Sequence, residues 1–380
     1  MAYNPRPMQD TSRIKAYHRR QIAVRVVGMA FGLAYAACWI APAQRWVTWF
    51  DSPWAAALSL AAAMFLGYQL LSLPLDIYGG YLLEHRFDLS NETPRHFVVQ
   101  QIKQTLVGAA IGGVIVAGFY ACLWYAGALW WLWLWVGWIV LTVVLARVFP
   151  TIILPIFYQC EPIDRPELAE RLTQMGEAAG VHVRGVYELK LSEETRKANA
   201  MLAGLGHTRR VLLSDTLLGE FRQPEIEVVF AHELAHHTRG HILKGLALGA
   251  VVSSAMVAAI VWAVGPAVDE PMAAAAAAPR ALLAVLVVGI VLLPVGNAVS
   301  RHFERQADAD ALQTTADPDA YISAFTRLGE QNLADPAPAR WIELLFYDHP
   351  PLSKRIAAAG AIEPPGDGGT GERRDGPTGY

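Results

Sequence analysis

The sequence predicts a mostly α-helical, polytopic membrane protein with a smaller α+β segment between its membrane helices. The chain of 380 residues is 54% hydrophobic and only 17% charged, whereas soluble domains carry about 25% charged residues. Six apolar stretches are long enough to cross a bilayer, which takes about 20 helical residues. Between the fourth and fifth stretches, the pattern changes to short alternating runs and amphipathic periods, which indicates a mixed α+β segment.

The first apolar stretch could be mistaken for a signal peptide. Arg19 and Arg20 precede it, and Ala41-Pro42-Ala43 resembles a cleavage site. Its apolar run is longer than a typical signal sequence and further spans follow, so we expect an uncleaved helix. The six predicted spans are 22–42, 55–75, 105–126, 128–148, 245–265 and 281–299.

Basic residues predict the orientation, because positive charge marks the cytoplasmic side of membrane proteins. They collect before the first span and between the second and third, at Arg13, Lys15, Arg19, Arg20, Arg86, Arg95 and Lys103. The loops on the opposite side carry few. Both termini, the 76–104 loop and segment 150–243 are therefore expected in the cytoplasm.

The chain is predicted to fall into six successive parts. They are a cytoplasmic arm (1–21), a four-helix membrane region (22–149) with a cytoplasmic loop (76–104), a soluble segment (150–243), a membrane hairpin (244–299), a second soluble segment (300–360) and a tail (361–380). The tail is rich in Gly, Pro and charge, which predicts disorder. A net charge of −3 gives no reason to expect a nucleic-acid partner.

The soluble segment reads as a small α+β unit. Residues 162–180 have an amphipathic helical period, and 181–189 alternate as a strand does. Residues 199–206 and 208–214 are predicted to pair as a β-hairpin. Pro224 then opens a helix whose acidic first turn suits its dipole.

That helix carries His232, Glu233 and His236 in the pattern H-E-x-x-H. Positions four apart share one helix face, so both imidazoles can bind one metal ion. Zinc favours such ligands and keeps a position open in catalytic sites. Glu233 lies where it can handle the proton of a metal-bound water. The pattern predicts one Zn²⁺ per chain; the alternative is a polar helix face with solvated histidines.

A catalytic zinc needs a third protein ligand. After the last span, Arg301, Glu304 and Asp308 share a helix face by their spacing. Two spans that run out and back return Glu304 to the side of the histidines, so it is a reasonable third ligand. Asp308 can accept a hydrogen bond from the outer nitrogen of a ligand histidine. The alternative is a salt-bridged helix end.

Further motifs stand in a recognisable order. They are Leu73-Pro-Leu-Asp-Ile-Tyr78, Glu84-His-Arg-Phe-Asp-Leu-Ser-Asn91, Lys197-Ala-Asn-Ala200, the H-E-x-x-H helix, Ser300-Arg301 with Glu304, and His349-Pro-Pro-Leu-Ser-Lys-Arg355. Together they resemble the CAAX prenyl endopeptidase family, integral-membrane zinc metalloproteases of the gluzincin type, over about residues 72–356. The resemblance implies a zincin-like catalytic domain with Glu304 as third ligand. The eukaryotic members are expected to have seven spans, one more than predicted here.

The resemblance also implies roles outside the metal site. Asn199 and Ala200 would bind the substrate backbone by strand addition. His349 would stabilise the oxyanion of the tetrahedral intermediate, supported by Arg355. A turn residue and a helix-start motif are the simpler interpretations of Asn199 and His349.

The resulting hypothesis is a membrane-embedded zinc endopeptidase acting near the cytoplasmic face of the bilayer. Its substrate would be a peptide or protein, prenylated or membrane-bound. One alternative is a quality-control metalloprotease with no prenyl requirement. Another is a zinc-binding membrane scaffold or transporter, although no predicted span has an ionisable residue at mid-depth, where ion pathways usually carry such residues.

Overall fold

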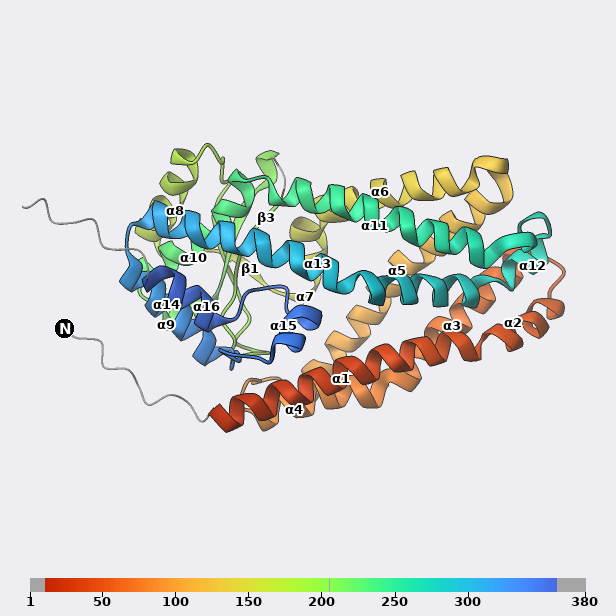
Figure 1. The fold of residues 1–380 in the computed structure, drawn as a ribbon, viewed down its shortest axis with the longest axis horizontal. Helices are drawn as coiled ribbons and strands as arrows, with labels where there is room; N and C mark the ends of the chain where they lie inside the picture. Colours follow the sequence, from red (N-terminus) through yellow and green to blue (C-terminus); the bar gives the residue numbers. More distant parts are fainter. Residues whose placement is uncertain (1–10, 205, 361–380) are drawn as a thin grey trace, which may run out of the picture.

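The computed structural model describes residues 11–204 and 206–360. Long helices run along one axis of an elongated molecule (Figure 1). A small sheet and several short helices gather at one end of this axis, and α12 lies at the other. The predicted tail at 361–380 and the first ten residues of the predicted arm lie outside the described residues.

The long helices agree with the predicted membrane architecture. Among the described residues, six helical stretches are long and apolar enough to cross a membrane, which confirms the predicted number. These stretches are Thr11–Trp49, Pro53–Arg86, Pro94–Tyr125, Gly127–Phe157, His241–Val264 and Ala278–Thr315. Their elements are α1 (Thr11–Cys38), α2 (Ile40–Trp46), η1 (Val47–Trp49), α3 (Pro53–Asp76), η2 (Ile77–Leu82), α4 (Leu83–Arg86), α5 (Pro94–Tyr125), η3 (Gly127–Leu129), α6 (Trp130–Val148), η4 (Phe149–Ile153), α7 (Leu154–Phe157), α11 (His241–Val264) and α13 (Ala278–Thr315), with η6 (Gly265–Asp269) and α12 (Pro271–Ala275) between the last two.

Residues 76–104, predicted as a loop, are mostly helical. α3 continues through the π-helical η2 into α4, and α5 begins at Pro94. The wider π turn follows Pro74, which lacks the N–H that a regular helix needs. The non-helical part is the strap 87–93, which pairs with the soluble segment: Asn91 N donates to Glu194 O at 3.0 Å. This strap ties the membrane helices to the soluble end.

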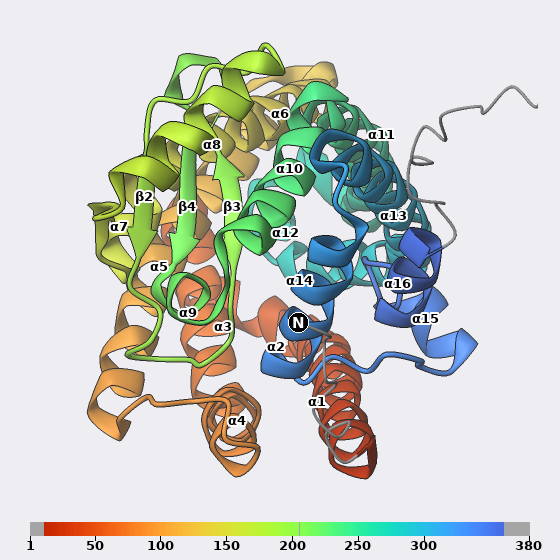
Figure 2. The ribbon, with the colours of Figure 1, turned by 90° about the vertical axis from the view of Figure 1, so that its left-hand side faces the viewer.

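The soluble end contains a four-stranded sheet. Its strands are β1 (Cys160–Pro162), β2 (Val186–Leu189), β3 (Ala200–Ala203) and β4 (Arg210–Ser214), in the order β1-β2-β4-β3. β3 and β4 are antiparallel with Leu202 opposite Val211, which confirms the predicted hairpin. The parallel pairing of β2 with β4 was not predicted. In this order β3 is an edge strand, next to α10 (Figure 2).

Helices cover this sheet and complete the soluble end. They are α8 (Pro166–Ala178), η5 (Gly206–Thr208), α9 (Asp215–Glu220), α10 (Gln223–Thr238), α14 (Pro318–Gln331), α15 (Arg340–Phe346) and α16 (Leu352–Gly360). The amphipathic helix predicted at 162–180 is α8, which buries Leu168, Leu172 and Met175 in the largest core cluster. The same core takes in residues of α10 and α14.

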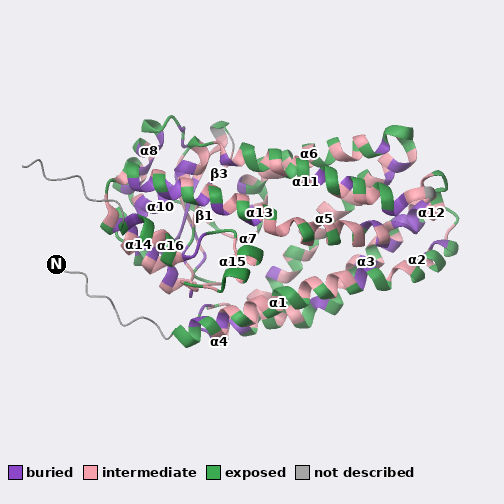
Figure 3. Ribbon diagram, in the orientation of Figure 1, coloured by how far each residue is buried: buried purple, intermediate pink, exposed green. Residues whose placement is uncertain are grey.

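Burial is uneven along the molecule. A second core lies at the far end, where Tyr120 and Trp130 pack with the alanines of α12. Between the two ends, exposed and half-buried residues alternate on the helices and few residues are buried (Figure 3). Many of the exposed ones are large and apolar, such as Leu106, Val251 and Val291. Such a surface is unfavourable in water and suits the hydrocarbon of a bilayer.

A close approach of the backbone at Gly176 gives a stability prediction. A Cβ added there would lie 2.9 Å from Val181 O and 2.8 Å from a methyl of Val183. We expect Gly176→Ala to destabilise the soluble end by about 1–3 kcal/mol, because overpacking forces backbone shifts. Thermal unfolding of the purified protein measures this. The control is Gly219→Ala in α9, where an added Cβ meets no atom within 4 Å; equal melting of both variants would contradict the packing argument.

Candidate active site

Helices α10 and α13 bring three candidate metal ligands together. His232 and His236 lie one turn apart on α10, and Glu304 lies on α13. Glu304 Oε2 is 3.2 Å from His232 Nε2, and Glu304 Oε1 is 3.3 Å from His236 Nε2. The two Nε2 atoms are 3.3 Å apart. Residues that are 68 to 72 positions apart in the chain therefore meet at one point.

The start of α10 is fixed by a buried charge. Pro224 lies in its first turn, and the Glu225 carboxylate accepts the backbone N–H of Arg222 at 2.8 Å. Glu225 is fully buried and also accepts a hydrogen bond from Ser323 Oγ in α14 at 2.5 Å. This capping box anchors the helix before it reaches the histidines.

The three ligand atoms fit a tetrahedral ion. Bonds of about 2.0–2.1 Å in tetrahedral geometry place ligand atoms about 3.3 Å apart, close to the three separations observed. Glu304 Oε2 is buried and has no hydrogen-bond partner in the described part of the chain, although His232 Nε2 is 3.2 Å away. An oxygen and an unprotonated nitrogen are expected to lie this close, without a hydrogen bond, when both direct a lone pair at the same metal ion. The donor set therefore fits a bound cation.

Glu233 lies beside the ligands and lines a cavity of about 360 Å³. Burial raises the pKa of its carboxyl group, and the neighbouring imidazoles of His232 and His236 act in the opposite direction. A carboxyl group with a raised pKa next to candidate metal ligands is suited to exchange protons with a water molecule in the cavity.

The outer nitrogen of His232 contacts a charged pair. Its Nδ1 lies 3.0 Å from Asp308 Oδ1. Arg355 binds the same carboxylate with two nitrogens, at 2.5 and 3.0 Å, and its guanidinium lies 3.9 Å above the Phe325 ring. The sequence hypothesis expected Asp308 at the outer nitrogen of a ligand histidine and Arg355 in support of His349. In the structure the guanidinium contacts Asp308, and one of its nitrogens lies 3.4 Å from Nδ1 of His232.

His349 approaches the ligands from the loop between α15 and α16. Its Nε2 lies 3.4 Å from Glu304 Oε1, and its Nδ1 lies 2.8 Å from Asp348. Partial burial acts to lower the pKa of His349, but the hydrogen bond to Asp348 and the charge of Glu304 outweigh it and raise the pKa. A protonated imidazole at this position can donate a hydrogen bond to an anion in the cavity.

Two residues of α13 that the sequence hypothesis left without a role hold this loop. Arg301 donates to Glu343 O at 2.9 Å and to Tyr347 O at 2.5 Å. Asn297 donates to Leu345 O at 2.7 Å. Their shared helix face was visible in the sequence, but their partners, more than 40 residues away, were not.

Asn199 and Ala200 line the same cavity as His232 and Glu233. Ala200 begins the edge strand β3, and Asn199 precedes it. Asn332, the residue after α14, fixes this segment: its side chain accepts a hydrogen bond from Ala198 N at 3.0 Å and donates one to Ala198 O at 3.2 Å. The site residues that line the cavity are Asn199, Ala200, His232, Glu233, His349 and Arg355.

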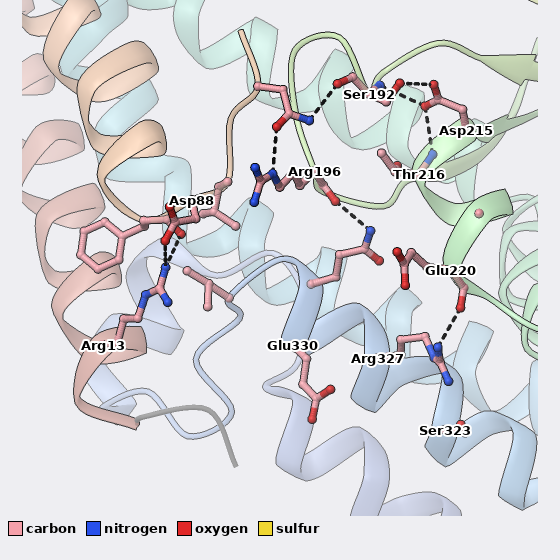
Figure 4. A pocket seen from close by; sticks show the side chains of 16 residues that line it. Arg13, Asp88, Ser192, Arg196, Asp215, Thr216, Glu220, Ser323, Arg327 and Glu330 are labelled. Carbon is pink, nitrogen blue, oxygen red and sulfur yellow. Dashed lines mark hydrogen bonds and ion pairs between the residues drawn. The ribbon is translucent and has the colours of Figure 1, made fainter. Parts of the chain in front are cut away.

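A larger polar groove of about 980 Å³ lies elsewhere on the soluble end (Figure 4). Its cationic side chains have partners: Arg13 pairs with Asp88 at 2.6 Å, Arg196 donates to Asn91 at 2.8 Å, and Arg327 donates to Glu220 O at 2.7 Å. The groove is thus a seam where one ion pair and two hydrogen bonds join α1 to the strap, the strap to the soluble segment, and α14 to α9.

A second cluster, Glu92, His96 and Glu194, could also surround a cation. All three residues are only partly buried, and His96 Nδ1 lies 3.1 Å from Glu92 and 3.7 Å from Glu194. These contacts connect the start of α5 with Glu194 of the soluble segment.

Two family models match this chain, one over the N-terminal membrane helices and one over the part that contains the candidate site. The family model "Peptidase family M48" matches residues 162–363, and the model "CAAX prenyl protease N-terminal, five membrane helices" matches residues 9–159. The chain belongs to peptidase family M48. Four of the six candidate spans lie in the region matched by the five-helix model.

Relatives and a solved structure agree with this membership. The uncharacterized metalloprotease YhfN of Bacillus subtilis is 28% identical over 76% of this chain and 70% of its own length. The CAAX prenyl protease 1 homolog of Arabidopsis thaliana is 25% identical over 79% of this chain and 72% of its own length. The crystal structure of S. mikatae Ste24p has the same fold, with a TM-score of 0.79 at 21% identity over 92% of this chain and 88% of that one. This M48 protein is therefore an integral, multi-pass membrane metalloprotease of the CAAX prenyl protease type, and its family implies a metal ion.

The Asp308 contact gives a prediction for metal binding. We expect Asp308→Asn to weaken metal affinity about 10- to 100-fold, because the outer partner of a ligand histidine sets its orientation and basicity. Competition with a chelator measures the affinity. The matched control is Asp310→Asn on the same helix, which removes only the pair with Arg239 at the surface. Equal affinities of the two variants would show that Asp308 does not act on the site.

Proposed function

We propose that this M48 protein is a zinc-dependent endopeptidase that cleaves peptide bonds at the cytoplasmic membrane face. The observation that carries the proposal is the convergence of His232, His236 and Glu304 at tetrahedral spacing, next to a cavity that His232 and Glu233 line together with the start of an edge strand. Imidazole and carboxylate donors in this number are typical of catalytic zinc, which leaves its fourth position open. The basic residues on one side of the spans support the cytoplasmic orientation.

The residues of the cavity have complementary roles in this mechanism. When bound, zinc supplies a Lewis acid that polarises a carbonyl and acidifies water. Glu233 accepts the proton of the attacking water and passes it to the leaving amine. His349 donates a hydrogen bond to the oxyanion that develops in the transition state. β3 binds the substrate backbone by adding it as a strand, with Asn199 and Ala200 at the cavity.

The proposed role of Glu233 predicts that its substitution abolishes catalysis without loss of the bound zinc. We expect Glu233→Gln to retain its zinc while peptidase activity falls by at least about 100-fold, because the amide cannot accept the proton. Zinc analysis and peptide digestion on the same preparation test both halves. Glu227→Gln, a change of the same kind two turns earlier on α10, is the control and should remain active. Full activity of Glu233→Gln would refute the assigned base.

The substrate proposed is a peptide segment next to a prenylated cysteine, in keeping with the name of the Arabidopsis thaliana relative. The test compares one peptide with and without a farnesyl group, at equal concentration and in the same detergent. We expect the farnesylated peptide to be cleaved at least about tenfold faster, since buried apolar chain adds binding energy. Equal rates would favour the alternative, a quality-control protease with no prenyl requirement.

A further inference from the structure

His241, outside the H-E-x-x-H pattern, is in contact with one of its histidines. It is the first residue of α11 and follows Gly240, whose φ of +66° ends α10 and turns the chain. His241 is 4% exposed, and its ring stacks on Phe303 at 4.4 Å with an interplanar angle of 8°. Its Nδ1 lies 3.1 Å from Nδ1 of His236, and its Nε2 lies 3.0 Å from Oε1 of Gln306.

The order of donors along these contacts follows from the metal site. His236 can bind an ion through Nε2 only if Nε2 presents a lone pair, so its proton must be on Nδ1. That N–H then donates to Nδ1 of His241, which must be unprotonated. Neutral His241 therefore carries its proton on Nε2 and donates it to the amide oxygen of Gln306. With this one arrangement of protons, both contacts of His241 are hydrogen bonds that have a donor and an acceptor.

We propose that His241 and Gln306 are positioning residues that hold His236 in the tautomer and orientation needed for metal binding. The inference rests on the proposed zinc site and deepens it. Outer partners of this kind fix the ring of a ligand histidine and raise its basicity. Here the partner is a second imidazole held by stacking and by an amide, so the support for His236 is uncharged.

This arrangement makes the two ligand histidines unequal. His232 contacts a carboxylate that Arg355 also binds, whereas His236 contacts a neutral relay. Both outer supports start from α13: Gln306 lies two residues after Glu304, and Asp308 two residues after Gln306. One turn of this helix thus supplies the third ligand and the supports of the other two.

The test uses two substitutions of His241, one that keeps an acceptor for the N–H of His236 and one that removes it. The amide oxygen of His241→Asn can take the place of Nδ1 and accept the N–H of His236, whereas His241→Ala removes the acceptor. We expect His241→Ala to weaken zinc affinity about 10- to 100-fold and His241→Asn to restore most of the loss. Affinity is measured by chelator competition on the full-length protein in detergent, with His302→Ala, an exposed histidine on α13, as control.

Gln306→Leu gives a second, independent measurement, since it removes the outer acceptor and leaves His241 in place. It should weaken zinc affinity in the same direction, and it decides the question if His241→Ala does not fold. Wild-type affinity in His241→Ala and in Gln306→Leu would overturn the relay, as would an Asn variant as weak as the Ala variant. Absence of zinc binding by the wild type would instead refute the metal site itself, and the relay with it.

Discussion

The structure depends on one long-range contact, the meeting of α10 with α13. Neither helix alone can bind an ion, because α10 supplies two imidazoles and α13 supplies the carboxylate. Between them in the chain, α11 runs out to α12, and α13 returns, so that α11 and α13 form the membrane hairpin. The membrane hairpin is therefore also the connection that closes the site, so the membrane and catalytic parts cannot be treated as independent units.

The length of α13 explains how the site keeps its geometry. It is one helix of 38 residues that begins among the membrane spans and ends in the soluble core. Its inner face carries Asn297 and Arg301, which hold the loop of His349, and then Glu304 and Asp308. A regular helix fixes such side chains at spacings of three and four. Ligand, supports and loop anchors are thus set by one rigid element, which is favourable for a preorganised site.

The parts of this site that sequence analysis could predict are those that depend on local spacing. The i, i+4 histidines, the face shared by Glu304 and Asp308, and the hairpin before Ser214 are all periodic patterns within a few residues. The contacts that it missed connect distant segments: Arg355 with Asp308, and Arg301 with the backbone of Tyr347. The parallel pairing of β2 with β4 belongs to the same class. A periodic pattern within one segment does not indicate which distant segment it will pack against.

The charges around the ligands also argue for a bound dication. Glu233, Glu304 and Asp308 bring three carboxylates into one partly closed region, and Arg355 supplies one guanidinium in contact with Asp308. With neutral histidines and an ionised Glu233 these groups carry two negative charges in excess, or one if His349, 3.4 Å from Glu304, is protonated. Burial makes either excess costly. A divalent cation held by His232, His236 and Glu304 would offset this charge. The metal ion that the family implies would therefore stabilise the soluble end as well as serve its chemistry.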